Sequence, residues 1–152
     1  MIQAQKTKAV LVTPPAAIND NAAAATAIID TLGWDYLEIY VLIGATDIAT
    51  AAMKVQESDD SGMSGAADIV GLRPGTDTDA FGAASALPTA NDDNTIQKFG
   101  INLLGRKRYI DLLLTGGDGS AGTYYAVLAV LSRGKEDPNT AAKMGCDLVM
   151  RA

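Results

Sequence analysis

The chain has 152 residues, 48% of them hydrophobic and 20% charged, and it carries a net charge of −6 at pH 7. This length and composition are typical of one folded domain with its own core, and they exclude an intrinsically disordered chain. The sequence contains no histidine, which excludes Ser-His and Cys-His catalysis as well as zinc sites built on histidine.

Five candidate strands occupy the first half of the chain. Gln5 to Thr13 is the first, and Ala24 to Thr31 is the second, although the alanines of this segment also permit a helix. Asp35 to Ile43 has the clearest pattern, because apolar residues alternate with mixed residues at a period of two. Ala52 to Ser58 and the short segment Ala67 to Gly71 follow, with a turn rich in Asp, Ser and Gly between them.

Three further strands are predicted in the second half. Thr95 to Leu104 and Lys107 to Thr115 are separated only by Gly105 and Arg106, which predicts a β-hairpin. A Gly-rich segment then leads into Thr123 to Ser132, which is rich in Tyr, Val and Leu. About eight short strands are typical of an all-β fold. We expect an antiparallel β-sandwich, a jelly-roll-like fold or a small barrel, with no helix longer than two turns.

Two segments do not show the periodicity of strands. Leu72 to Asn94 contains two prolines and many Ala, Thr and Asp residues, so it is predicted as a long loop that is either functional or disordered. The apolar residues after Arg133 would either fold back as an edge strand or dock on a neighbouring subunit. The predicted organisation is a β-sandwich domain over residues 1–134, with an N-terminal strand or arm, and an extended C-terminal arm over residues 135–152.

Cysteine usage, apolar runs and basic residues indicate where the protein is made and what it binds. Cys146 has no partner for a disulfide within the chain, which favours synthesis in a reducing compartment. The apolar run Ala9 to Val12 is too short for a signal peptide, and no other run approaches the length of a membrane helix. The basic residues are scattered apart from Arg106, Lys107 and Arg108, which are expected in a solvated turn. We therefore expect neither a membrane nor a nucleic acid as a partner.

No residue pattern predicts a catalytic, cofactor-binding or metal-binding site. Gly117, Gly119 and Gly122 spell G-x-G-x-x-G. A dinucleotide site requires a helix after this loop, whereas the segment after it is a predicted strand, so we expect a hairpin turn. Acidic loop residues do not match the pattern of a Ca²⁺-binding loop and are expected in solvated turns. They are Glu57, Asp59, Asp60, Asp77, Asp79, Asp92 and Asp93. We therefore expect a protein that is not an enzyme.

Six aromatic residues lie in or beside the predicted strands. Aromatic faces pack well against sugars, so these residues are candidates for a carbohydrate-binding platform. Such residues more often fill or border the core of a β-sandwich, and the sequence leaves both interpretations open. They are Trp34, Tyr36, Tyr40, Tyr109, Tyr124 and Tyr125.

Several segments together resemble a known family. They are Leu37 to Ala45 (LEIYVLIGA), Met53 to Asp60 (MKVQESDD), Ala67 to Gly71 (ADIVG), and Lys107-Arg108-Tyr109 with the alternating strand after it. Over Asp30 to Arg133 this order resembles small virion proteins of tailed bacteriophages. The resemblance implies a β-sandwich subunit that decorates or cements the phage head. It also implies synthesis in the cytoplasm of the bacterial host, a place on the capsid surface and the major capsid protein as partner.

A cement role also implies self-association and arms. We expect a homo-oligomer, and a trimer would suit a threefold position on the shell. Met1 to Thr13 or Lys135 to Ala152 would reach onto neighbouring subunits. Two alternative functions remain open, which are a carbohydrate-binding β-sandwich module and a neck or tail component of the virion. The long loop and the C-terminal arm depart from the family pattern and are expected to be particular to this particle.

Overall fold

The computed structural model of the chain describes residues 6–15, 18–135 and 138–150, and no α-helix occurs within these ranges. Eight strands are present, as predicted, and a short 3₁₀ helix, η2 (Ala142–Met144), follows the last strand. Residues 1–5 of the predicted N-terminal arm lie outside the described residues, as do 136–137 and 151–152 of the predicted C-terminal arm. In chain order the strands are β1 (Thr7–Thr13), β2 (Ile29–Asp30), β3 (Tyr36–Thr46), β4 (Ala52–Ser58), β5 (Ala67–Asp68), β6 (Thr95–Asn102), β7 (Tyr109–Thr115) and β8 (Thr123–Ser132).

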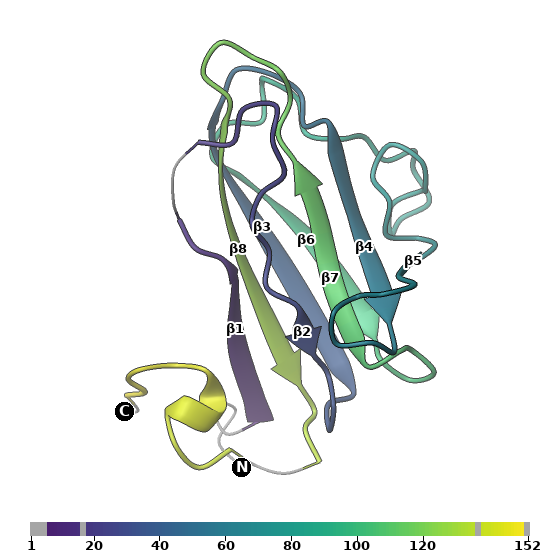
Figure 1. Ribbon diagram of the computed structural model, residues 1–152, viewed down its shortest axis with the longest axis vertical. Coiled ribbons are helices and arrows are strands. Elements are labelled where there is room, and N and C mark those ends of the chain that lie inside the picture. The colour runs from purple at the N-terminus through teal and green to yellow at the C-terminus, as the bar shows by residue number, and fades with distance from the viewer. Residues whose placement is uncertain (1–5, 16–17, 136–137, 151–152) are drawn as a thin grey trace.

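The strands form two four-stranded sheets that pack face to face as a β-sandwich (Figure 1). Sheet A has the order β1-β8-β3-β6 and sheet B the order β2-β7-β4-β5, and all neighbouring strands are antiparallel. The sheets include the pairs β1 with β8, β2 with β7, β3 with β6, and β4 with β5. This is the pairing of a jelly roll. The structure thus confirms the predicted sandwich and gives its topology.

Two predicted hairpin turns are wrong, because the chain crosses between the sheets at both of them. β6 pairs with β3 in sheet A, whereas β7 pairs with β4 and β2 in sheet B. Leu103 is buried directly after β6, so the chain turns across the end of the sandwich instead of back along the same sheet. The Gly-rich segment between β7 and β8 crosses back in the same way. Among consecutive strands, only β4 and β5 pair with each other.

β6 and β7 are each two residues shorter than predicted, and two further strands are much shorter. In the predicted strand Ala24 to Thr31, only Ile29 and Asp30 pair regularly with β7, and Ala23, just before this segment, forms an isolated bridge with Thr115. Three of the five residues from Ala24 to Ile28 are alanine, a residue that is depleted in strands. β5 covers only the first two residues of the predicted strand Ala67 to Gly71.

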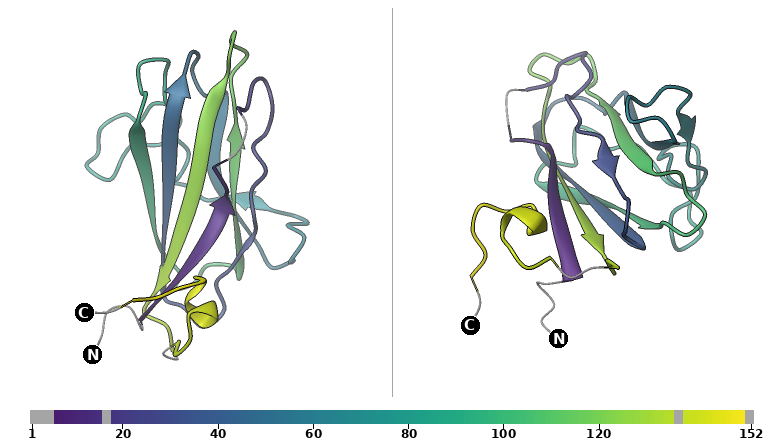
Figure 2. Two further views of the ribbon diagram at one scale, coloured as in Figure 1. Left: turned by 90° about the vertical axis from the view of Figure 1, so that its left-hand side faces the viewer. Right: turned by 60° about the horizontal axis from the view of Figure 1, so that its bottom comes forward.

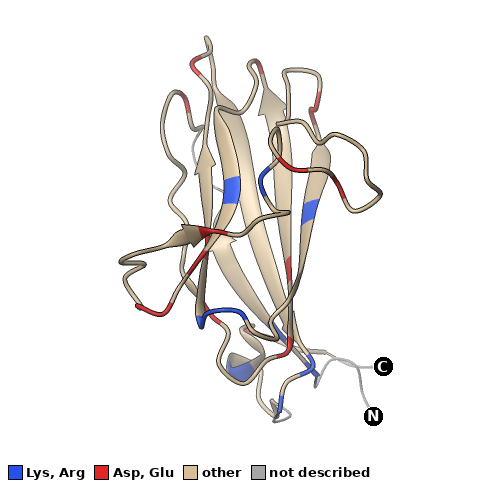
Figure 3. Cartoon of the chain, turned by 90° about the vertical axis from the view of Figure 1, so that its right-hand side faces the viewer, with Lys and Arg blue, Asp and Glu red and all other residues tan. Residues whose placement is uncertain are grey.

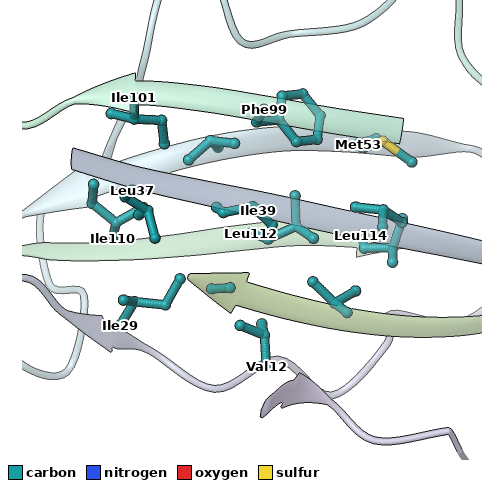
Figure 4. Packing of buried hydrophobic residues seen from close by; sticks show 14 of the residues in the cluster. Val12, Ile29, Leu37, Ile39, Met53, Phe99, Ile101, Ile110, Leu112 and Leu114 are labelled. Carbon is teal, nitrogen blue, oxygen red and sulfur yellow. The ribbon is translucent and has the colours of Figure 1, made fainter. Parts of the chain in front are cut away.

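The inward-facing residues of both sheets make one hydrophobic core (Figure 4). β3 and β8 contribute alternate residues from sheet A, and β4 and β7 do so from sheet B, as the period of two in a strand requires. Completely buried side chains include Ile29, Leu37, Ile39, Val41, Val55, Ile110, Leu112 and Leu131.

The C-terminal segment folds back against the first strand, but it does so as a short helix rather than as the edge strand considered from the sequence. η2 lies beside β1 at the lower end of the sandwich, and Met144 is buried (Figures 1 and 2). A Cβ atom on Gly145 would overlap the carbonyl oxygen of Ala9, so the two backbones are in direct contact. At this point the segment packs on its own subunit.

Candidate functional site

The two outer faces of the sandwich differ in polarity. Sheet B carries an ion pair between Lys54 and Asp68, whose Nζ and Oδ1 atoms are 2.9 Å apart, and Gln56 donates a hydrogen bond to the same carboxylate. The outward positions of sheet A instead hold mostly apolar residues and tyrosines. A sheet face in contact with water is normally polar. The outer face of sheet A is therefore the first candidate interaction surface.

This outer face consists of the strand residues of sheet A that point away from the core. The strand register places Leu128 of β8 between Leu11 of β1 and Tyr40 of β3. In the next row Leu42 of β3 lies opposite Ile96 of β6, which is 62% exposed. Contiguous exposed apolar surface of this kind marks an interaction site. The other apolar and aromatic members of the face are Ala9, Tyr36, Tyr124, Ala126 and Val130.

Glu38 and Lys98 are the only charged residues among the strand residues that make up the outer face. Their Oε1 and Nζ atoms are 2.5 Å apart, and the Tyr40 hydroxyl donates a hydrogen bond of 3.0 Å to Glu38 Oε2. The hydrogen bond with Lys98 lowers the pKa of Glu38, and the same bond raises the pKa of Lys98, so both stay charged at neutral pH. The two charges neutralise each other and leave the face without net charge.

Two tyrosines of the outer face cover glycines on neighbouring strands. A Cβ atom on Gly100 would lie 2.6 Å from the Tyr36 hydroxyl oxygen, and one on Gly44 would lie 3.0 Å from the Cβ atom of Tyr124. Each tyrosine therefore occupies space that a side chain would otherwise fill. Beside Tyr124 and Leu42 the face is hollowed by an apolar depression of about 230 Å³. The aromatic groups of the face are thus held in place by packing.

The 72–94 loop is held together by hydrogen bonds to carboxylates rather than by regular secondary structure. Asp77 accepts hydrogen bonds from the backbone nitrogens of Gly71 and Arg73, and from the Arg73 guanidinium at 2.7 and 2.9 Å. The bonds from the Arg73 side chain are the main reason that the pKa of Asp77 falls to about 2. Leu72 and Leu87 pack against the core. The loop is therefore fixed to the sandwich.

Phe81 lies at the tip of this loop and is 95% exposed. Residues 78–84 form a small turn that is closed by an antiparallel bridge between its first and last residues. Within the turn, Asp79 Oδ1 accepts hydrogen bonds from the backbone nitrogens of Phe81 and Ala83, at 2.9 and 2.8 Å. An exposed aromatic side chain on a fixed turn has the form of an interface anchor, because a few residues carry most of the binding energy at an interface. Phe81 is the second candidate interaction site.

Replacing Arg73 by methionine is expected to raise the pKa of Asp77 from about 2 towards its ordinary value of 3.8, since the guanidinium bonds are lost. An NMR titration of the Asp77 carboxyl group measures this change. Because the folded-state pKa is lowered, the contribution of Asp77 to stability is present above pH 3.8 and is lost as the pH falls through about 2. A pKa that stays near 2 in the variant would contradict the assigned cause.

The G-x-G-x-x-G segment binds a carboxylate that belongs to the chain itself. The backbone nitrogens of Ser120 and Ala121 each donate a hydrogen bond of 2.7 Å to Asp47 Oδ2, and Gly122 donates one of 2.9 Å to Oδ1. These bonds lower the pKa of Asp47, and the bond from Ala121 has the largest effect. The donors of this loop are thus occupied by the neighbouring loop between β3 and β4.

The charged loop residues singled out from the sequence largely pair within or between loops. Arg106, in the turn between β6 and β7, has its Nη1 atom 3.4 Å from Glu57 Oε1. Arg108 follows in the same turn, and its Nη2 atom lies 2.7 Å from Oδ2 of Asp30 in β2. Asp60 accepts hydrogen bonds from the backbone of its own turn. Within residues 6–15, 18–135 and 138–150, no group of three or more His, Cys, Asp or Glu side chains is arranged to hold a metal ion. The same part of the chain contains no helix long and apolar enough to cross a membrane.

The six aromatic residues do not form a single platform. Tyr125 is buried, and its hydroxyl group is 2.8 Å from that of Thr50. Trp34 packs against the core, and Tyr109 lies in sheet B. The aromatic residues that share the outer face of sheet A are Tyr36, Tyr40 and Tyr124.

Comparisons of the chain with protein families, curated proteins and solved structures found no match. Its function is therefore inferred from the two surfaces described above and from the resemblance of the sequence.

Proposed function

We propose that the chain is a structural protein of a tailed-bacteriophage particle, where it binds the outside of the capsid and stabilises it. The observation that carries the proposal is the fixed loop that presents an exposed Phe81 from a β-sandwich. The resemblance of Asp30 to Arg133 to small virion proteins suggests the major capsid protein as the partner. Jelly rolls serve in viral particles and also in lectins, so the fold agrees with this role but does not decide it.

Phe81 is proposed as the anchor of the capsid contact. A few residues, often aromatic, carry most of the binding energy at an interface when the pocket around them excludes water. Asp77 and Asp79 hold the loop in one conformation, so little freedom remains to be lost on binding. A loop fixed before contact therefore favours affinity.

Stabilisation of the shell follows from mass action. A protein that binds capsid subunits in the assembled shell, and not the dissociated subunits, shifts the equilibrium towards the shell. This role requires a rigid body and a fixed contact rather than reactive groups. The protein would be made in the cytoplasm of the bacterial host and would act on the capsid surface.

Replacing Phe81 by alanine is expected to weaken binding to capsids by about 10- to 100-fold, as the loss of an interface anchor does. Co-sedimentation of the purified protein with phage capsids that lack it measures the affinity, and the heat resistance of the particles reports stabilisation. Leu104→Ala is the matched control, because Leu104 is 88% exposed but lies in the turn after β6. Wild-type protein that does not sediment with capsids would contradict the function, whereas unchanged binding of Phe81→Ala would contradict only the anchor.

The same purified protein separates the alternative functions. A carbohydrate-binding module would bind glycans and would not sediment with capsids. A neck or tail component would label one end of the particle, and not the shell, in images of virions that carry the labelled protein.

A further inference from the structure

We propose that the outer face of sheet A binds a second copy of this chain, so that two β-sandwiches pair face to face. The contact is separate from the proposed capsid contact, because Phe81 is not part of the outer face. Three features of the face favour a second copy as its occupant. They are its size, its charge, and the cover at both edges of the sheet.

The face is large enough for a stable dimer. Four strands at a spacing of about 4.8 Å, each contributing about eight residues with a rise of about 3.4 Å, give a face of roughly 500 Å² in projection. Two faces in contact remove on the order of 1,000 Å² from water, which is the size at which specific interfaces begin. Protruding side chains add to this area.

The outer face has the residue composition of the centre of a protein interface. Leu42 is 40% exposed and Leu128 is 38% exposed. Tyr40 lies opposite Leu128, and Tyr124 lines the same depression as Leu42. The centres of protein interfaces are rich in tyrosine and poor in charged residues. Figure 2 (left) shows sheet A from this side, and no described segment crosses in front of the middle of β6, β3 and β8.

The charge distribution favours a second copy. Two chains that each carry a net charge of −6 repel each other, and this repulsion is weakest where they meet at a surface without net charge. The outer face meets this condition through Glu38 and Lys98, whereas acidic residues are spread over the loops in the view onto sheet B (Figure 3). A face with one acid and one base is complementary to itself about a two-fold axis, since Glu38 of one copy can meet Lys98 of the other.

The edges of sheet A are less open than its face. η2 and Gly145 lie against β1 at one edge. At the other edge, β6 and the 72–94 loop line a common cavity of about 650 Å³. This cover hinders pairing through strand addition at the edges. A self-complementary face pairs about a two-fold axis, so we replace the trimer expected from the sequence by a dimer.

The mass of the protein in solution tests the proposal. Sedimentation equilibrium at micromolar concentration is expected to give a dimer with twice the 15.7 kDa mass of the chain. Replacing Leu42 by lysine is expected to lower the association constant by about 100-fold or more, because a charged side chain would be buried in a contact closed to water. Leu42 is already partly exposed, so the folded monomer should tolerate the change.

Leu128→Lys provides a second variant within the face. Leu104→Lys makes the same change of charge at an exposed leucine outside the face, and it should remain a dimer. Circular dichroism establishes that each variant is folded. A wild-type monomer or trimer would overturn the proposal, and so would a dimer that persists in both Leu42→Lys and Leu128→Lys.

Discussion

Replacing Leu112 by alanine is expected to lower the free energy of unfolding by about 2 to 5 kcal/mol. Leu112 lies in the middle of β7, has no exposed surface and belongs to the core between the two sheets. β7 pairs with β2 on one side and β4 on the other, so the surrounding backbone cannot easily close around the cavity left by the missing atoms. Denaturation in urea, followed by circular dichroism, measures the loss.

Leu113 provides the matched control. It is the next residue in the same strand, and it points to the outer face of sheet B, where it is partly exposed. Leu113→Ala removes the same atoms without opening the core, and it is expected to cost about 1 kcal/mol or less. Equal losses in the two variants would contradict the inward and outward assignment of β7.

Replacing Gly122 by alanine is expected to lower the free energy of unfolding by about 2 to 4 kcal/mol. Two effects add up, which are the strain of a positive φ in a residue with a Cβ atom and the overlap of that atom with its neighbours. Gly122 has a φ of 76°, where residues with a Cβ atom are strained, and a Cβ atom there would lie 2.6 Å from the carbonyl oxygen of Asn19. The backbone is held on both sides, because Gly122 donates a hydrogen bond to Asp47 and Thr123 donates one to Asn19. Thermal and urea unfolding measure the loss.

Gly105→Ala separates the two effects. Gly105 has almost the same φ, 77°, but no atom lies within 4 Å of a Cβ built there. Only the strain of the positive φ remains, and the free energy of unfolding is expected to fall by about 1 to 2 kcal/mol. If the two glycine variants lost the same stability, the close approach of Asn19 would have no energetic role.

The strands could be predicted from the sequence, but their arrangement could not. Period-two alternation gave the bounds of β4 and β8 and nearly those of β3, because each strand buries one side. The alternation does not say in which sheet a strand lies. The predicted hairpin before β7 is wrong because β6 and β7 lie in different sheets. The burial of Leu103 continues the inward alternation of Phe99 and Ile101, so the pattern gave no sign that the chain leaves the sheet there.

The candidate sites were only partly visible in the sequence. The outward-facing residues of β3 include Tyr36, Tyr40 and Leu42. Because these side chains are aromatic or apolar, the sequence already indicated that the outward side of this strand is not purely solvated. Only the sheet order shows that these residues join those of β8 and β6 in one surface. Phe81 was not singled out, although a lone phenylalanine in a polar loop is itself a signal. Its exposure depends on the turn held by Asp79, which no periodic pattern reveals.

The order of strands in sheet A has a consequence for synthesis. β1 leaves the ribosome before the other seven strands, but its partner in sheet A is β8, and Thr7 pairs with Ser132. β8 also separates β1 from β3, so sheet A lacks one of its central strands until β8 has been made. Pairing between such distant segments is slow and requires all of them to be present. A chain terminated before β8 therefore cannot complete sheet A.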